Sequence, residues 1–379
     1  MTTASPLRFP SRVRVVTAAG GVAGACLVTV DDGRIALRTD GTGYRPDDAD
    51  YFVSPGWVDL HSHIYDGMTQ IGVRPDRVGL DQGVHLLADA GSAGEATVRG
   101  MIDYILPDTL TDVRLWLNIG SHGLVHLREV ADPSYIDVDA TLAAIERHRE
   151  VICGVKVRSS GLIVGGMGLQ PLELAKLVAR EARLPLMVHV GEAPPLIDDV
   201  LDRLDAGDVV THCFHGKTGT PWGPDGKPSR GMADALARGV FLDVGHGAAS
   251  FDIGVARRAI AAGYRPHTLG SDIHVRNIDG PVFDLATVMT KLLDAGLTLQ
   301  EVVAGVTDTA RERIGAEDEW LGADGLVRHA TVFQVTDQPV AGRVYRDASG
   351  HTWQPARHVV AVGTVRDGRW RAVAARDPR

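Results

Sequence analysis

Six side chains that could take part in metal chemistry lie one after another along the chain, each at the end of a short apolar run. Buried parallel strands are apolar runs of this kind, and their carboxyl ends meet on one face of a barrel. Taken singly, a histidine at a strand end is more often a buried core residue than a ligand, but four of them in order favour a metal site. The pattern therefore predicts a two-metal hydrolytic centre built from His61, His63, Lys156, His189, His212 and Asp272.

The chemistry of these side chains does not fit a metal equally well. His61 and His63 stand two residues apart on a predicted strand, so both imidazoles face the same side and can bind one ion. Asp272 could contact a metal and a bound water together and carry a proton from that water to the leaving group. Its alternative role is the N-cap of the next helix. Because an ammonium cannot bind a cation, Lys156 judged by residue type alone is an ion-pair partner or binds a substrate anion.

Eight apolar runs supply the strands that must position these side chains. Helical patterns such as TLAAIERHRE, LELAKLVAREA, MADALARG and VARRAIAAG fill the gaps, and TVMTKLLDAG and TLQEVVAGVTDTARERIG follow as closing helices. Strand and helix alternating eight times predict an α/β fold, a (β/α)₈ barrel of the TIM type over residues 55–321. The strand runs are GWVDLH, HLLADAG, VRLWLNI, ICGVKV, LPLMVHV, DVVTHC, VFLDVGH and HTLGSD.

The two ends of the chain have a different pattern from the middle. Residues 1–54 and 322–379 contain short runs in which apolar and polar side chains alternate, such as CLVTV and ATVFQV, with turn signals such as Asp32-Gly33. Neither end is long enough to bury much surface alone. We therefore expect both ends to form one small β-sandwich domain beside the barrel.

Composition limits the class of protein. The chain has 379 residues, of which 44% are apolar and 23% charged, and a formal net charge of −9. Nucleic-acid binding needs clustered Lys and Arg, which the sequence lacks. The segment 15–30 is apolar but interrupted by glycines, so we expect it to form a hairpin rather than a signal peptide. Cys26, Cys153 and Cys213 fit a reduced cytoplasmic protein. We expect a small-molecule substrate and neither a nucleic acid nor a membrane as partner; a homo-oligomer is compatible with the sequence.

Five ordered motifs resemble those of the amidohydrolase superfamily, and within it the amidohydrolase/deacetylase subgroup, whose members have often been labelled dihydroorotases. The motifs are PGWVDLHSH, GVKVRSS, LMVHVGEAP, VVTHCFHGK and LGSDIHVRN, and the resemblance covers nearly the whole chain. It implies that Lys156 is an N6-carboxylysine whose carbamate bridges two divalent ions. The imidazole and carboxylate side chains themselves favour Zn²⁺ over Mn²⁺ and Fe²⁺. The resemblance also implies that the first ion is bound by His61, His63 and Asp272, and the second by His189 and His212.

The reaction implied by this resemblance uses a metal-bound hydroxide as the nucleophile. A water shared by two cations loses its proton near neutral pH, and one cation polarises the scissile carbonyl. In this mechanism Asp272 carries the proton, and no serine or cysteine of the chain forms a covalent intermediate.

The substrate is less well defined by the sequence than the metal site. Dihydroorotases typically carry an arginine two residues after the second histidine, where this chain has Tyr65. We therefore expect hydrolysis of an acyl ester or amide of a small carboxylic acid, as in a deacetylase or deacylase. A cyclic amide hydrolase of the hydantoinase or dihydroorotase type is the alternative, and a non-catalytic barrel scaffold is a third. The predicted substrate-binding residues are Arg158, His215, His274, Arg276 and Asn277.

Overall fold

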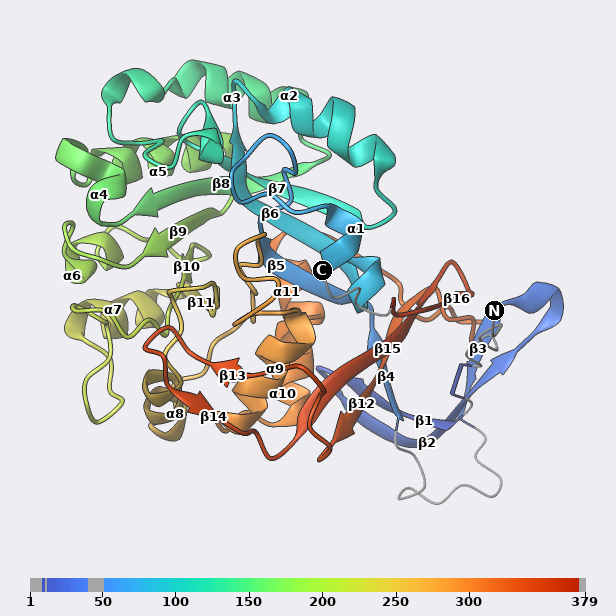
Figure 1. Ribbon diagram of the computed structural model, residues 1–379. Coiled ribbons are helices and arrows are strands. Elements are labelled where there is room, and N and C mark those ends of the chain that lie inside the picture. Colours follow the sequence, from blue (N-terminus) through green and yellow to red (C-terminus); the bar gives the residue numbers. More distant parts are fainter. Residues whose placement is uncertain (1–8, 11, 40–50, 375–379) are drawn as a thin grey trace.

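The barrel is a curled parallel sheet of seven strands in the order β11-β10-β9-β8-β7-β6-β5 (Figure 1). The computed structural model describes residues 9–10, 12–39 and 51–374. Most residues of these strands are buried, as is expected of parallel strands that are covered on both faces. The bounds are β5 Trp57–Ser62, β6 Val84–Gly94, β7 Asp112–Asn118, β8 Ile152–Ser159, β9 Leu186–Val190, β10 Val209–Thr211 and β11 Phe241–Asp243.

The eighth strand position is occupied by an extended segment that makes isolated bridges. Thr268 pairs with Asp243 of β11 and Ile273 pairs with Ser62 of β5, both in parallel, so this segment closes the ring. The expected run HTLGSD thus lies where the eighth strand should be, but it is not a regular strand. One reason is the backbone of Asp272, whose φ of 50° departs from extended geometry.

Helices cover the outer face of the barrel (Figure 1). Several begin at a side chain that accepts a backbone N–H, such as Asp252 before α8, and Thr298 forms a capping box with Glu301 at α10. The bounds are α1 Pro75–Val78, α2 Val98–Gly100, α3 Val138–Arg147, α4 Gly161–Val164, α5 Gln170–Ala182, α6 Ile197–Leu201, α7 Arg230–Arg238, α8 Ile253–Ala261, α9 Leu285–Asp294, α10 Leu299–Gly305 and α11 Asp308–Arg313.

Strands from both ends of the chain form a second seven-stranded sheet, in the order β16-β15-β12-β4-β1-β2-β3. The two ends meet where β4 pairs with β1 in parallel and with β12 antiparallel. Side chains such as Val13, Val53 and Val332 form its own buried core. The bounds are β1 Arg12–Thr17, β2 Gly20–Thr29, β3 Ile35–Arg38, β4 Tyr51–Pro55, β12 His329–Thr336, β15 His358–Arg366 and β16 Arg369–Ala372.

A short hairpin leaves this second sheet and packs against the barrel. Its strands, β13 (Tyr345–Arg346) and β14 (Thr352–Trp353), lie beside α8 and α9 in Figure 1. The backbone N–H of Ala348 donates to the carbonyl oxygen of Phe251 at 2.9 Å, just before α8. The C-terminal segment therefore contacts a loop of the barrel as well as its own sheet.

The predicted α/β fold, a TIM-type barrel with a small β-sandwich built from both ends, is confirmed. One helix prediction is wrong: TLQEVVAGVTDTARERIG forms two helices rather than one, because the backbone of Thr307 leaves helical geometry at φ −131° and ψ −103°. The domain boundaries stay a prediction, and residues 1–8, 11, 40–50 and 375–379 of the predicted β-domain lie outside the described residues.

Within the described part of the chain, no single helix combines the length and apolar character needed to cross a membrane. The segments Gly161–Met167 and Gln170–Ala182 reach both only when taken together, and they are bent by 89°.

Candidate metal centre

The six predicted metal-site side chains meet at the carboxyl end of the barrel strands. Nε2 of His61 and Nε2 of His63 lie 3.4 and 3.0 Å from Oδ1 of Asp272. Nε2 of His212 lies 2.8 Å from Nδ1 of His189. One ligand atom each from His61, His212 and Asp272 lie within 4.8 Å of one another, close enough to bind one ion together. All six side chains line one cavity. β5 contributes His61, β8 Lys156 and β9 His189, whereas His63 directly follows β5, His212 directly follows β10, and Asp272 lies in the eighth strand position.

Two of these residues have a left-handed backbone, with φ of 68° at His212 and 50° at Asp272. Such a conformation costs a non-glycine residue on the order of 1–3 kcal/mol and persists only where the surrounding structure enforces it. Both residues stand where a strand position ends, so the left-handed turn redirects each side chain into the cavity. Strain of this kind is concentrated at functional sites.

Hydrogen bonds on the far side of the ring fix His61 and His212. Nδ1 of His61 lies 2.8 Å from the hydroxyl of Thr211, which in turn donates to Oδ2 of Asp243 at 2.7 Å. The hydroxyl proton is thus used on Asp243, so the hydroxyl accepts from Nδ1–H of His61 and leaves the Nε2 lone pair facing Asp272. In the same way Nδ1 of His212 must donate to the carbonyl of Gly245 at 2.5 Å, which leaves its Nε2 unprotonated.

The segment that carries Asp272 is held by a second buried carboxylate, Asp59 of β5. Asp59 accepts the backbone N–H of Ser271 at 2.9 Å and also the Ser271 hydroxyl. On the other side, the Nδ2 amide of Asn277 donates to the carbonyl of Asp272 at 2.8 Å. Asp272 is therefore fixed on both sides.

Burial sets the protonation states at the centre. It lowers the pKa of His61 to about 4, and it holds the pKa values of His189 and His212 well below their usual range. Burial alone would raise the pKa of Asp272, but the adjacent His61 and His63 hold it well below its usual range. At neutral pH these pKa values leave unprotonated imidazole nitrogens facing a carboxylate anion, which is the donor set that a divalent cation prefers.

Lys156 is fully enclosed in this centre. In the described residues its Nζ makes one hydrogen bond, to the thioether sulfur of Met187 at 3.3 Å. Burial lowers the pKa of Lys156 to about 7, so a large share of the amine is neutral under ordinary conditions. Gly91 makes the space: at its φ of +86° an added Cβ would stand 2.7 Å from Cγ of Lys156.

The cavity is small, about 110 Å³, and two of the predicted substrate-binding residues line it, Arg158 and His274. Arg158 makes a bidentate ion pair with the buried Glu129, with both distances 2.7 Å, and its Nη2 also donates to the carbonyl of Leu127. These contacts fix the guanidinium of a residue that lines the cavity. Apolar side chains from the loops after β5 and β7, Ile71 and Leu124, complete the wall.

The other substrate-binding predictions lie outside this cavity. Arg276 is exposed and donates to Gln70 at 3.2 Å, and Asn277 holds the backbone of the Asp272 segment. His215 is buried, and neither ring nitrogen has a partner in the described residues. Tyr65, which replaces the arginine of dihydroorotases, is buried in the hydrophobic core and donates to the carbonyl of Thr97 at 2.8 Å.

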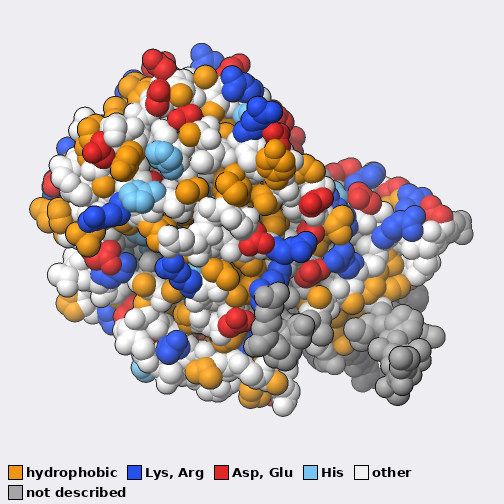
Figure 2. Space-filling model, turned by 45° about the horizontal axis from the view of Figure 1, so that its top comes forward, with side chains coloured by type: hydrophobic (Ala, Val, Ile, Leu, Met, Phe, Trp, Pro, Cys, Tyr) orange, Lys and Arg blue, Asp and Glu red, His pale blue; other side chains and the backbone are white. Residues whose placement is uncertain are grey.

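Sequence reasoning missed the groups behind the ligands, namely Thr211, Asp243, Asp59 and Ser92. The hydroxyl of Ser92 lies 3.0 Å from Nδ1 of His63. Asp243 lies in the middle of the predicted strand run VFLDVGH, and in the structure it ends β11 and pairs in register with Thr211. The charges in Figure 2 are of both signs and are interspersed over the face shown.

Three curated proteins are similar to this chain. No family model matches it. A deacetylase of Agrobacterium fabrum is 40% identical over 346 residues, which cover 88% of this chain and 85% of that protein. A deacetylase of Brucella anthropi is 40% identical over 303 residues, 79% of this chain and 74% of that protein. A deacetylase of Enterococcus faecalis is 32% identical over 320 residues, 84% of this chain and 86% of that protein.

Two solved structures share the fold of this chain over nearly its whole length. A crystal structure of a dihydroorotase superimposes with a TM-score of 0.85 at 36% identity and covers 97% of this chain and 98% of that one. A crystal structure of an adenine deaminase gives a TM-score of 0.83 at 29% identity and covers 95% of this chain and 99% of that one. Together with the ligand cluster at the barrel mouth, these likenesses show that the chain belongs to the amidohydrolase superfamily, in the group of the curated deacetylases.

Proposed function

We propose that this chain hydrolyses an acyl ester or amide of a small carboxylic acid, with an acetyl group as the favoured acyl group. The observation that carries the proposal is the convergence of four imidazoles, an ionised carboxylate and a buried lysine on one small cavity. The names of the curated relatives, all deacetylases, support the acyl specificity. The cavity of about 110 Å³ favours a short acyl group over a long one.

We propose two divalent cations in this centre, with Zn²⁺ the favoured ion. The protein groups fit such a pair: His61, His63 and Asp272 would bind one ion, and His189 and His212 the other. When bound, the cations activate a water and polarise the acyl carbonyl. Lys156 would bridge them as N6-carboxylysine, because its neutral amine can add to CO₂ with loss of one proton and so replace a cation by an anionic oxygen ligand.

The residues of the chain then supply binding and proton transfer. Asp272 takes the proton of the attacking water at its carboxylate and gives it to the oxygen or nitrogen of the leaving group. Arg158, fixed by Glu129, holds the carboxylate of the substrate through the part of its guanidinium that faces the cavity. We propose a small-molecule substrate; the cytoplasmic location, the absence of nucleic-acid and membrane partners and the oligomeric state stay predictions.

A substrate panel tests the proposal on protein prepared with zinc and bicarbonate. The panel contains acetyl esters and acetyl amides of α-hydroxy and α-amino acids, the same compounds with the carboxylate replaced by a primary amide, and cyclic amides. We expect turnover of acetylated acids, at least tenfold lower kcat/KM for the primary amides, and about two ions per chain by elemental analysis. Turnover of cyclic amides alone would favour the hydantoinase or dihydroorotase type. Absence of both turnover and metal would favour a scaffold.

A further inference from the structure

Away from the six predicted ligands, α9 carries a lysine that is completely buried, Lys291. Its Nζ has three acceptors: Nε2 of His246 at 2.8 Å, the carbonyl of Pro281 at 3.0 Å and the carbonyl of Arg346 at 2.7 Å. Three acceptors match the three N–H groups of an ammonium. A buried ammonium is tolerated only when its donors are used, so this arrangement is closely specified.

His246 connects Lys291 to the segment after β11. Nδ1 of His246 lies 2.8 Å from the carbonyl oxygen of Gly247 and must therefore donate to it, which leaves Nε2 as the acceptor for Lys291. The backbone N–H of His246 donates to the carbonyl of Gly270 at 3.0 Å, and that of Gly247 donates to the carbonyl of Ser271 at 3.0 Å. The segment held by Lys291 is thus bonded to the segment that ends at Asp272.

Gly247 also touches the reactive carboxylate itself. An added Cβ at this position would stand 2.3 Å from Oδ2 of Asp272, so the backbone of Gly247 forms the wall against which that carboxylate rests. A shift of His246 would move this wall and change the position of the carboxylate.

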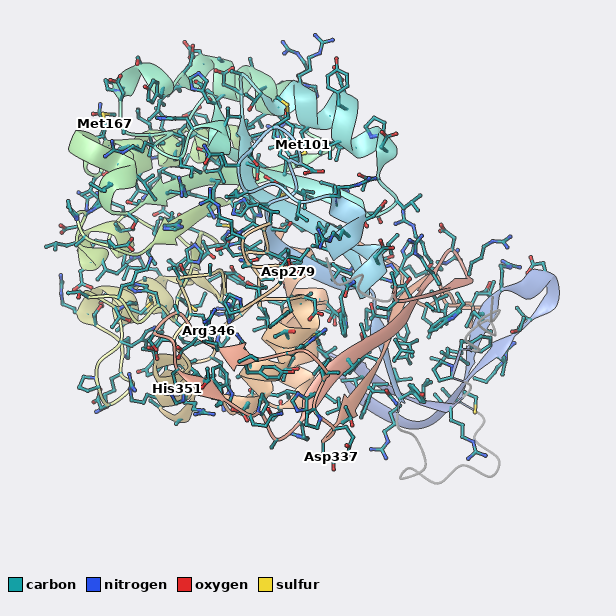
Figure 3. All side chains as sticks on the ribbon, viewed as in Figure 1. Met101, Met167, Asp279, Asp337, Arg346 and His351 are labelled. Atoms are coloured by element: carbon teal, nitrogen blue, oxygen red, sulfur yellow. The ribbon has the colours of Figure 1, made fainter. Side chains whose placement is uncertain are left out.

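The third acceptor of Lys291 belongs to the C-terminal hairpin. Arg346 lies on β13, and Figure 3 places it beside the barrel rather than with the main β-domain sheet. A second contact anchors the same hairpin independently: Arg343 pairs with Asp284 at the start of α9 and donates to the hydroxyl of Thr287 at 2.6 Å. Lys291 therefore bonds both to the hairpin and, through His246, to the wall of the metal centre. The side chain of Arg343 attaches the hairpin to the start of α9 and makes no hydrogen bond to His246 in the described residues.

We propose that Lys291 is a positioning residue for Asp272, which acts through His246 and the Gly247 wall. The proposal deepens the hydrolase function and rests on it for its kinetic readout. Without Lys291 the imidazole of His246 loses the partner of its Nε2, and the segment after β11 loses its tie to α9. The carboxylate of Asp272 then samples positions that are unsuited to proton transfer and to metal binding.

Lys291→Met tests the idea, since methionine keeps most of the length of the stem and removes the ammonium. Groups that orient metal ligands typically contribute about 10–100-fold to activity or metal affinity, and we expect a loss of that size in kcat with KM changed far less. His246→Leu, in which the two carbonyl acceptors of Lys291 remain, should give a similar loss. The double variant should lose no more than either single variant, because both act along one path.

The control is Arg343→Met, which weakens the attachment of the hairpin without touching His246. We expect it to lower the melting temperature and to leave kcat unchanged. A loss of kcat in this control equal to that of Lys291→Met would overturn the proposal in favour of a general effect of the hairpin. Wild-type kcat in Lys291→Met would overturn it as well.

A readout without substrate separates this proposal from the hydrolase function. Zinc affinity, measured by competition with a chromophoric chelator, should fall about tenfold or more in Lys291→Met and stay at the wild-type value in Arg343→Met. If the wild type binds zinc but hydrolyses no compound of the panel, the proposed function fails, and the chelator titration still decides on Lys291. Equal zinc affinity in the wild type and Lys291→Met would then overturn the positioning role.

Discussion

Addition of one methyl group at Gly247 should inactivate the proposed hydrolase without unfolding it. At this position an added Cβ would stand 2.3 Å from Oδ2 of Asp272, whereas ordinary van der Waals contacts of a Cβ begin at 3.4 Å. Either the carboxylate or the glycine backbone must therefore move by about 1 Å in Gly247→Ala. A displacement of about 1 Å at a reacting group can cost on the order of 100-fold in rate.

The stability effect of the same change can be separated from the contact. Gly247 has a φ of +57°, and alanine in this left-handed region costs about 1–2 kcal/mol. Gly315, an exposed residue just after α11, has a similar φ of +61°, and an added Cβ there meets nothing within 4 Å. Gly315→Ala thus carries the backbone cost alone, and the difference between the two variants reports the contact with Asp272.

The assay compares both variants with the wild type in kcat, zinc content and urea unfolding. We expect Gly315→Ala to lose about 1–2 kcal/mol of stability and to keep the wild-type kcat. Gly247→Ala should fold and lose about 100-fold in kcat. If Gly247→Ala keeps the wild-type kcat while its zinc content is unchanged, then the position of the Asp272 carboxylate does not limit the reaction, and our reasoning about the wall is refuted.

Three further predictions concern a support of the metal centre, the metal itself, and a buried histidine away from the centre, His85, whose ring contacts the carbonyl of Ala330 in β12. Thr211→Val removes the hydroxyl between His61 and Asp243 and should weaken zinc affinity about 10–100-fold in a chelator titration; an unchanged affinity would mean that this hydroxyl does not orient the ring. Removal of the metal should lower the melting temperature, because an ion that binds only the folded state at 100 times its Kd adds about 2.7 kcal/mol; an unchanged melting temperature would argue against a metal centre. Burial lowers the pKa of His85 to about 3 from 6.5, so the unfolded chain binds the proton more readily and stability is lost as the pH falls below 6.5. Between pH 6.5 and 5 this residue accounts for about 2 kcal/mol, and urea unfolding should show a weaker pH dependence in His85→Gln; an equal dependence would contradict the assignment.

The barrel and the meeting of the six predicted metal-site side chains at its mouth could be predicted from the sequence because both follow from local patterns. Each strand is an apolar run of a few residues, and a polar residue at its end falls on the carboxyl face of a parallel barrel whatever the loops do. His61 and His63 needed only the alternation of a strand. The β-sheet of the two ends was predictable from alternation as well, although pairing of β4 with β12 joins residues far apart in the chain.

The groups that orient the ligands could not be predicted, because their partners are distant in sequence. Asp59 and Ser271 are 212 residues apart, and Thr211 is 150 residues from His61. Arg158 shows the same limit: its charge was visible, but its pairing with Glu129, 29 residues earlier, was not. A residue type indicates what a group can do, whereas its partner decides whether the group is free to do it.

The left-handed ligands show why these distant partners matter for function. His212 and Asp272 adopt a backbone that other residues avoid, and each is held there by bonds from elsewhere: the carbonyl of Gly245 accepts from His212, and Asn277 donates to the carbonyl of Asp272. The two predicted ligands are thus fixed by the protein itself, so metal binding would need little reordering of their side chains. It follows that changes in these supporting groups should act on kcat and metal affinity more strongly than on the stability of the fold.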